Sequence, residues 1–305
     1  MTNHQQTVKR PIAYLPAFII ALIVTTLLGV FGVFGVFGPS GAFGASQVSA
    51  SGANGTDVTN GTDGTIPKEL VVAGAADLRP AFEEIGKLFS AQTGSKVTFS
   101  FGSSGQLAQQ IANGAPFDVF ASADVSFVDK VLSAGIGDAS TKATYAFGRL
   151  ALWLPSNVNR KIAEVKDLTN SSIQRIAIAN PDHAPYGRAA VQSLKSTKVY
   201  SKVSNRLVFG ENVSDAYRLA TSGNADAALV SLSLVIADNH NGRYTIIPAS
   251  AHKPLEQAIV VTATKARSPL SKSFVAIVTS PAGRAVMRKY GFLLRGEPIP
   301  TTKVP

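Results

Sequence analysis

Five short turns carry the residues best suited to bind a small anion. Each turn is rich in small, polar or hydroxyl residues, and each separates a strand-like run from a helix-like run: residues 74–77, 102–105, 185–187, 210–213 and 230–231. The first N–H groups of a helix have no acceptor inside the helix, and the helix dipole places partial positive charge there. One such Ser or Gly is more often an ordinary N-cap, so only the set of turns indicates an anion site.

The sequence contains no recognisable catalytic motif. Residues 102–105 read Gly-Ser-Ser-Gly, but Gln106 takes the place of the last Gly in a Gly-x-Ser-x-Gly nucleophile turn, and no glycine-rich phosphate loop follows a strand. We expect His183 to fix its loop by a hydrogen bond. The absence of Cys excludes thiolate metal sites and lipid-modified Cys, and the His residues are too scattered for a metal cluster: His4, His183, His240 and His252. We therefore expect no enzyme, no cofactor and no metal ion.

Alternating strands and helices position these turns. The hydrophobic spacing predicts strands at 69–73, 96–101, 117–121, 149–154, 175–179, 207–209, 227–230, 244–247 and 258–263. It predicts helices from about 78 to Gly94, around 107–111 and 188–194, from 213, over 232–237, and from 269 and 281. This order is typical of an α/β fold, in which ligands lie beyond the carboxyl ends of the strands. The five turns occupy that position.

Length and composition bound the class of protein. A chain of 305 residues indicates two domains, and 45% hydrophobic with 16% charged residues excludes wholesale disorder. The net charge is +10, from 29 Lys and Arg against 19 Asp and Glu, so the surface should attract anions. Because no basic run of the nucleic-acid type occurs, we expect no nucleic-acid partner.

The N-terminal segment predicts export. Lys9 and Arg10 precede an uncharged apolar stretch at 11–38, so residues 1–38 form a signal peptide or a membrane anchor. The stretch is longer than a usual signal-peptide core and comparable to the ~20 residues that cross a bilayer, which leaves cleavage and membrane association both open. Residues 39–67 are rich in Gly, Ser, Thr, Asn and Asp and predict a flexible linker.

Several motifs, taken in order, carry a resemblance to a known family. They are Ala-Ala-Asp-Leu at 75–78, Phe-Gly-Ser-Ser-Gly-Gln-Leu-Ala-Gln-Gln-Ile at 101–111, Gly-Ala-Pro-Phe-Asp-Val-Phe-Ala-Ser-Ala-Asp at 114–124, Asn-Pro-Asp-His-Ala-Pro-Tyr-Gly at 180–187, Gly-Glu-Asn-Val at 210–213 and Arg-Lys-Tyr-Gly-Phe at 288–292. From about 69 to about 292 the chain resembles the substrate-binding proteins of molybdate ABC importers. The resemblance implies an α/β, two-lobed periplasmic-binding-protein fold with its ligand cleft at the hinge. It also implies lobe 1 at 68–148 plus 249–294, lobe 2 at 149–248, and a C-terminal tail at 295–305.

The resemblance further implies a function and a set of contacts. The chain would capture molybdate, and tungstate as well, for an ABC permease and its ATPase, as an exported monomer in the periplasm or at the outer face of the cytoplasmic membrane. Ligand contacts would come from Asp77, Ser104, Tyr186 and Val213, the last two largely through backbone N–H groups, and from the hydroxyl of Ser231. Two alternatives stay open: a binding protein for another oxyanion such as phosphate, and an enzyme acting on phosphate or sulfate esters.

Asp77 departs from the resemblance, since many members of the family have Ser there. A carboxylate facing a dianion would repel it. We expect Asp77 to cap the following helix with its side chain while a backbone N–H faces the ligand. If instead the carboxylate points into the site, it would favour a protonated oxyanion such as hydrogen phosphate, because an ionised carboxylate can only accept hydrogen bonds.

Overall fold

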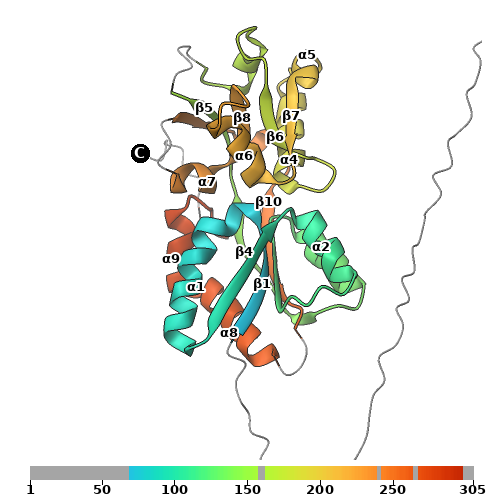
Figure 1. Ribbon diagram of the computed structural model, residues 1–305, viewed down its shortest axis with the longest axis vertical. Coiled ribbons are helices and arrows are strands. Elements are labelled where there is room, and N and C mark those ends of the chain that lie inside the picture. The colour runs from blue at the N-terminus through green and yellow to red at the C-terminus, as the bar shows by residue number, and fades with distance from the viewer. Residues whose placement is uncertain (1–68, 157–161, 239–241, 264–266, 298–305) are drawn as a thin grey trace, which may run out of the picture. The chain divides into compact units, whose positions relative to one another are not determined.

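A computed structural model describes residues 69–156, 162–238, 242–263 and 267–297 (Figure 1). The predicted export segment at 1–38 and the predicted linker at 39–67 lie outside the described residues, as does most of the predicted tail. Within the described ranges, no helix combines the length and the apolar character that a membrane span requires.

Two five-stranded mixed sheets form the framework. The first has the order β2-β1-β3-β10-β4, with β1 Glu69–Ala75, β2 Lys96–Gly102, β3 Val119–Ser122, β4 Asp138–Gly148 and β10 Leu255–Val261. The second has the order β7-β6-β8-β5-β9, with β5 Leu150–Pro155, β6 Ile176–Ala179, β7 Leu207–Gly210, β8 Ala227–Ser231 and β9 Gly242–Ile246. In the first sheet, β10 pairs antiparallel with both of its neighbours, and in the second sheet β5 does the same. All other strand pairs in the two sheets are parallel. The α/β prediction is confirmed.

The helices cover these sheets. They are α1 Arg79–Thr93, α2 Ser104–Ala112, α3 Val125–Ser133, α4 Pro185–Ser196, α5 Tyr200–Val203, α6 Val213–Thr221, α7 Leu232–Ala237, α8 Ser268–Thr279 and α9 Pro281–Lys289. Short 3-10 turns occur at η1 Ala76–Leu78, η2 Val165–Thr169, η3 Ser204–Arg206 and η4 Ala249–Ala251. Strands β6 and β8 are buried along their whole length, as their continuous apolar sequence requires.

Helix α1 shows how the sequence sets an element. Phe82, Ile85 and Phe89 recur at helical spacing and are fully buried. Phe82 and Phe89 each pack edge-on against Phe274 of α8, with ring centroids 5.7 and 5.5 Å apart. The helix ends at Gly94, whose φ of 67° is the left-handed conformation that glycine adopts most easily. The first predicted turn lies between β1 and the start of this helix.

Three elements were absent from the sequence prediction. They are strand β4 and helices α3 and α5, and β4 is the longest strand that the structure describes. Its first half is polar and largely exposed, so it lacks the apolar run that marks the other strands. The predicted strands correspond to observed ones with their ends shifted by at most a few residues.

Two connections join the sheets. Strand β4 continues into β5 through Arg149, and the chain returns from β9 to β10 through η4. A third segment, after α9, pairs with the first connection through the Phe147 N–H and the Leu293 carbonyl at 2.7 Å, and through the reverse bond at 3.0 Å. The connections and the segment after α9 thus lie side by side.

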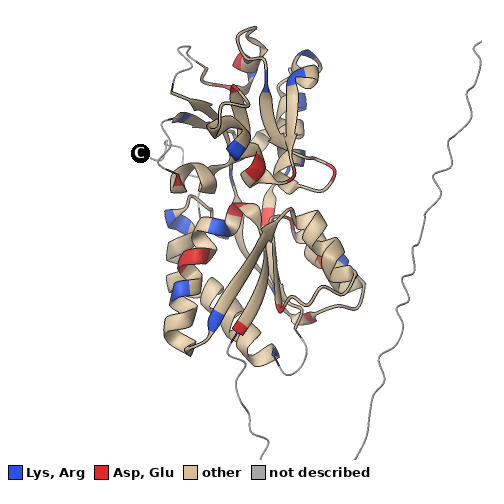
Figure 2. Ribbon diagram, in the orientation of Figure 1, with Lys and Arg blue, Asp and Glu red and all other residues tan. Residues whose placement is uncertain are grey.

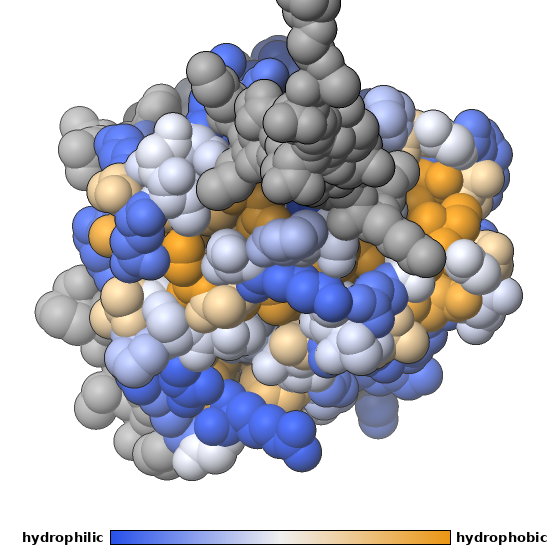
Figure 3. All heavy atoms as spheres, turned by 90° about the horizontal axis from the view of Figure 1, so that it is seen from below, coloured by the Kyte–Doolittle hydropathy of each residue, from blue (hydrophilic) through white to orange (hydrophobic). Residues whose placement is uncertain are grey.

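Charged residues are spread over the surface. Figure 2 shows Lys and Arg interspersed with Asp and Glu on the helices of both sheets, and not gathered in one basic stripe. In Figure 3, apolar residues appear in several separate areas between hydrophilic ones. Among the described residues, Phe209 is the one large hydrophobic side chain that is exposed, at 54%.

Candidate functional site

Four of the five predicted contact residues line one small pocket. It has a cavity volume of about 10 Å³, and its walls are Ala75, Ala76, Asp77, Gly102, Ser103, Ser104, Ala123, Ala184, Pro185, Tyr186, Asn212 and Val213. These residues come from the end of β1 and from η1, from the ends of β2 and β3, and from the starts of α2, α4 and α6. Asp77, Ser104, Tyr186 and Val213 are therefore brought together, whereas Ser231 is not on the wall. Whether these residues contact a ligand stays a prediction.

Three helix starts converge on this pocket, and each has a local cause. Pro185 occupies the first position of α4, where its missing N–H costs nothing. Asn212 caps α6 because its side-chain oxygen accepts from the N–H groups of Ser214 and Asp215, at 2.9 and 3.1 Å. The first N–H groups of these helices have no intrahelical acceptor and bring partial positive charge to the pocket. None of the described wall residues is Lys or Arg.

The hydroxyl of Ser104 has a proton available for an anion. Ser104 is 1% exposed, and its Oγ accepts the backbone N–H of Ala123 at 3.0 Å. Accepting this bond orients the hydroxyl but does not use its proton. The group can therefore donate to an oxygen placed in the pocket.

Ser103 and His183 hold α2 against the second sheet. The Ser103 hydroxyl donates to the His183 carbonyl at 2.6 Å, and the Gly105 N–H donates to the same carbonyl at 3.0 Å. The His183 Nδ1 lies 2.9 Å from the Ser103 Oγ. Since the one proton of Ser103 goes to the carbonyl, Nδ1 must be the protonated ring nitrogen that donates to Oγ. His183 thus makes the loop-fixing hydrogen bond that the sequence predicts.

Asp77 does not cap a helix, and that prediction is wrong. The N-cap of α1 is Leu78, and no side chain caps this helix. The 3-10 turn η1 separates β1 from α1, and Asp77 lies within this turn, two residues before α1 begins. Its Oδ2 accepts from the Tyr186 hydroxyl at 3.1 Å and from the Gln257 Nε2 at 2.5 Å. Its Oδ1 is buried and has no hydrogen-bond partner among the described residues.

Burial sets the protonation of this carboxyl. Asp77 is 1% exposed, and burial raises its pKa to about 6, against the opposing effect of the hydrogen bonds from Gln257 and Tyr186. Burial and the neighbouring Asp77 charge raise the pKa of Tyr186 and of Tyr145 well above the ordinary value. The Tyr145 hydroxyl donates to the Gln257 Oε1 at 3.0 Å. The carboxyl is thus held by neutral donors, and no described cation contacts it.

Ser231 contacts a neighbouring serine. It is fully buried, and its Oγ lies 3.2 Å from the Oγ of Ser233. The Ser233 hydroxyl donates to the Asp77 carbonyl at 2.7 Å, which joins α7 to η1. The sequence analysis did not find Ser233, Gln257 or Tyr145. Of these three residues, only Gln257 could have been noticed in the sequence, because it is an uncharged polar residue next to the apolar run of β10.

Comparison with known proteins places the chain in a family. Residues 70–293 match the family described as bacterial extracellular solute-binding proteins. The chain belongs to this family. The molybdate-binding protein ModA of Rhodobacter capsulatus is 37% identical over 227 residues, which cover 74% of this chain and 88% of that protein. The ModA of Azotobacter vinelandii is 33% identical over 231 residues, covering 74% and 90%.

Solved structures agree with the fold. The Azotobacter vinelandii periplasmic molybdate-binding protein superposes with a TM-score of 0.70 at 32% identity, covering 74% of this chain and 99% of that chain. The sulfate-binding protein SubI from Mycobacterium tuberculosis H37Rv shares the fold at 14% identity, with a TM-score of 0.64 and coverage of 75% and 88%. The predicted two-lobed periplasmic-binding-protein fold is confirmed.

Proposed function

We propose that this chain is an extracytoplasmic molybdate-binding protein that delivers its ligand to the permease and ATPase of an ABC importer. The observation that carries the proposal is the convergence of three helix starts and the Ser104 hydroxyl on one buried pocket without a basic residue in its described wall. The relatives named as molybdate-binding proteins, at 37 and 33% identity, support the choice of oxyanion. We further propose an exported monomer, in the periplasm or at the outer face of the cytoplasmic membrane.

Neutral donors would hold the oxyanion. The backbone N–H groups of Asp77, Tyr186 and Val213 and the Ser104 hydroxyl can converge on a tetrahedral ligand. Each hydrogen bond to a charged group contributes about 1.5 to 3 kcal/mol, so a few of them suffice without Lys or Arg. Tungstate has the same shape and charge as molybdate and would use the same donors. For Ser231 to contribute, its hydroxyl would have to turn from Ser233 toward the pocket.

Asp77 sets a condition on this binding. An ionised carboxylate in the wall repels a dianion, whereas the protonated form is neutral and can donate a hydrogen bond. The unpartnered Oδ1 is the oxygen available to carry that proton. We therefore propose that molybdate binds with Asp77 protonated. Molybdate affinity should then rise as the pH falls through about 6, the pKa of this carboxyl.

One observation favours a second candidate, a binding protein for hydrogen phosphate. The same unpartnered Oδ1, if ionised, could accept a hydrogen bond from a ligand that carries its own proton. The 37 and 33% identity to relatives named as molybdate-binding proteins supports molybdate more strongly.

Ester hydrolysis has no support in the geometry. Ser103 and His183 are in contact, but the serine donates to a carbonyl and accepts from Nδ1, which is not the arrangement of a nucleophile and its base. We propose that the chain binds its ligand without chemical change. Turnover of p-nitrophenyl phosphate or p-nitrophenyl sulfate by the purified protein would contradict this.

Calorimetric titration with molybdate, tungstate, sulfate and phosphate tests the proposal. We expect 1:1 binding of molybdate and tungstate, with much weaker binding of phosphate. Phosphate binding in preference to molybdate would support the second candidate and reject the first. The same titrations at pH 6 and pH 8 test Asp77, because the Asp77→Asn variant should lose the pH dependence that the wild type shows.

A further inference from the structure

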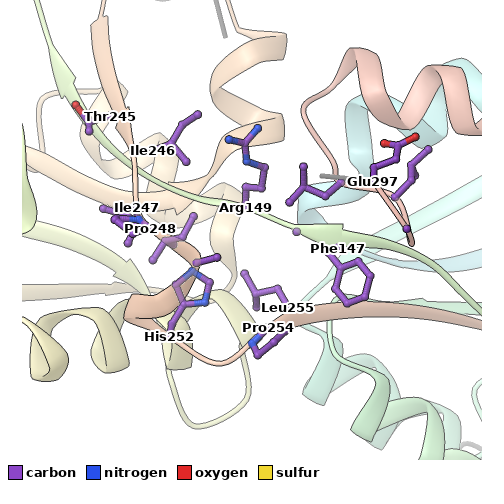
Figure 4. Close-up of a pocket in the computed structure, with 16 residues that line it drawn as sticks. Phe147, Arg149, Thr245, Ile246, Ile247, Pro248, His252, Pro254, Leu255 and Glu297 are labelled. Carbon is purple, nitrogen blue, oxygen red and sulfur yellow. The ribbon is translucent and has the colours of Figure 1, made fainter. Parts of the chain in front are cut away.

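A second, larger cavity lies beside the connections between the two sheets. It has a volume of about 470 Å³ and shares no lining residue with the candidate site. Its walls come from the first connection at 147–150, from 245–249 and 252–255 on the second, and from the segment after α9 at 293–297 (Figure 4). Cavities that hold small organic ligands span about 300 to 1,000 Å³. The size of this cavity fits such a ligand.

The walls of the cavity are mainly apolar. They include Phe147, Leu150, Ile246, Leu255 and Leu294, which come from four different segments of the chain. Arg149 lines the same cavity, and Figure 4 shows its side chain together with those of Phe147, Ile246 and Leu255. A ligand in this cavity would therefore meet an apolar surface and one guanidinium group.

Arg149 has no carboxylate partner among the described residues. The residue is 9% exposed, Tyr244 is the one described group that raises its pKa, and its guanidinium nitrogens are not among the buried atoms that lack a partner, so they are accessible from the cavity. Burial lowers its pKa, although a guanidinium stays protonated in a folded protein. Other arginines that are partly buried are paired, as Arg188 is with Asp124 at 2.9 Å. Partial removal from water is costly for a charge without an ionic partner, which sets Arg149 apart from the other partly buried arginines that the structure describes.

Neither of the other titratable groups on the wall neutralises it. The Glu297 carboxylate pairs with the Arg288 Nη2 at 2.7 Å, and this pairing lowers the pKa of Glu297. The His252 Nδ1 is engaged by the Lys253 carbonyl at 2.7 Å. The cavity therefore has an excess of one positive charge inside an apolar wall.

We propose that this cavity binds a small carboxylate with an apolar body, whose carboxylate pairs with Arg149 while its chain or ring packs on the apolar wall. A guanidinium presents paired N–H donors that match the two oxygens of a carboxylate. A single cation in an apolar wall suits a monoanion, and the apolar area disfavours a bare inorganic ion. This site is independent of the proposed oxyanion site.

Octanoate and its neutral counterpart octanamide test the proposal on the purified full chain by calorimetric titration. We expect octanoate to bind 1:1 and octanamide to bind at least about tenfold more weakly, which is the effect of one charge-assisted hydrogen-bonded pair. The Arg149→Gln variant should bind both probes equally weakly. The control Lys130→Gln removes an exposed charge on α3 and should bind octanoate as the wild type does.

A second variant keeps the test decisive if Arg149→Gln does not fold. Ile246→Trp fills the cavity without removing the charge, so octanoate binding should be lost while molybdate binding is unchanged. Failure of the wild type to bind octanoate would overturn the proposal. Equal affinity of the wild type for octanoate and octanamide would overturn it too, as would unchanged octanoate binding in Ile246→Trp.

Discussion

The two cavities differ in the sign of the titratable group in their walls and in the partners of that group. In the candidate oxyanion site the charged group is the Asp77 carboxyl, and two neutral donors, Tyr186 and Gln257, hold one of its oxygens. In the cavity beside the connections the charged group is Arg149, and no described carboxylate pairs with it. The protein carries a net charge of +10, yet its described oxyanion wall has no basic residue. Net charge therefore does not reveal where an anion binds, while local hydrogen-bond donors do.

The largest expected effect on the free energy of unfolding comes from the ionisation of Asp77. Its folded pKa of about 6 lies above its ordinary value of 3.8, so the folded state holds the proton to higher pH than the unfolded state does. The resulting stability is fully present below about 3.8 and is lost as the pH rises through about 6, a total of about 3 kcal/mol. Urea unfolding from pH 4 to pH 8 should show this decline in the wild type and not in Asp77→Asn. Parallel profiles of the two proteins would mean that Asp77 is not buried as described.

The second expected effect comes from Gly148, which lies between the two cavities. A Cβ atom at this position would stand 2.3 Å from the Tyr186 hydroxyl and 2.9 Å from the Gln257 Nε2. Gly148→Ala should therefore displace both donors from Asp77 and lower the free energy of unfolding by about 1 to 3 kcal/mol. The control is Gly102→Ala, where the nearest atoms are 3.5 Å from the added Cβ. Equal stability of the two variants by chemical unfolding would show that the Asp77 contacts contribute little.

A smaller change in the free energy of unfolding is expected for a substitution of Arg149, and this change is an increase. Arg149→Met removes a charge that is partly withdrawn from water without a carboxylate partner and keeps an apolar side chain of similar length, so it should raise the free energy of unfolding by about 1 kcal/mol when no ligand is bound. Thermal unfolding of both proteins in ligand-free buffer measures this. A loss of stability would show that Arg149 has a favourable partner in the folded chain.

The two regions also differ in how far the sequence could predict them. The strand-to-helix turns depend on local patterns, and four of the five contact residues that the family resemblance implies at those turns line one pocket. Ser231 was also implied by the resemblance, and in the structure its hydroxyl lies beside Ser233. The role of Asp77 was missed because it depends on η1 and on Gln257, which is 180 residues away along the chain. Local spacing carries no information about such a contact.

The cavity beside the connections could not be predicted at all. Arg149 appeared in the sequence as the first residue of an ordinary strand, a position that is often exposed. Its burial depends on the segment after α9, which returns to pair with Phe147. Strand β4, which leads to Arg149, was itself missed because its first half is polar. Features built from several distant segments require the folded chain.

The most direct test of the account is the titration of wild type, Ser104→Ala and Ser133→Ala with molybdate and phosphate. Ser104 offers a free hydroxyl proton to the pocket, whereas Ser133 is exposed at the end of α3 and serves as the matched control. The wild type and Ser133→Ala should bind molybdate equally and in preference to phosphate. Ser104→Ala should bind molybdate at least about tenfold more weakly, the effect of one hydrogen bond to a charged group. Equal affinity of all three proteins for molybdate, or a preference of the wild type for phosphate, would contradict the account.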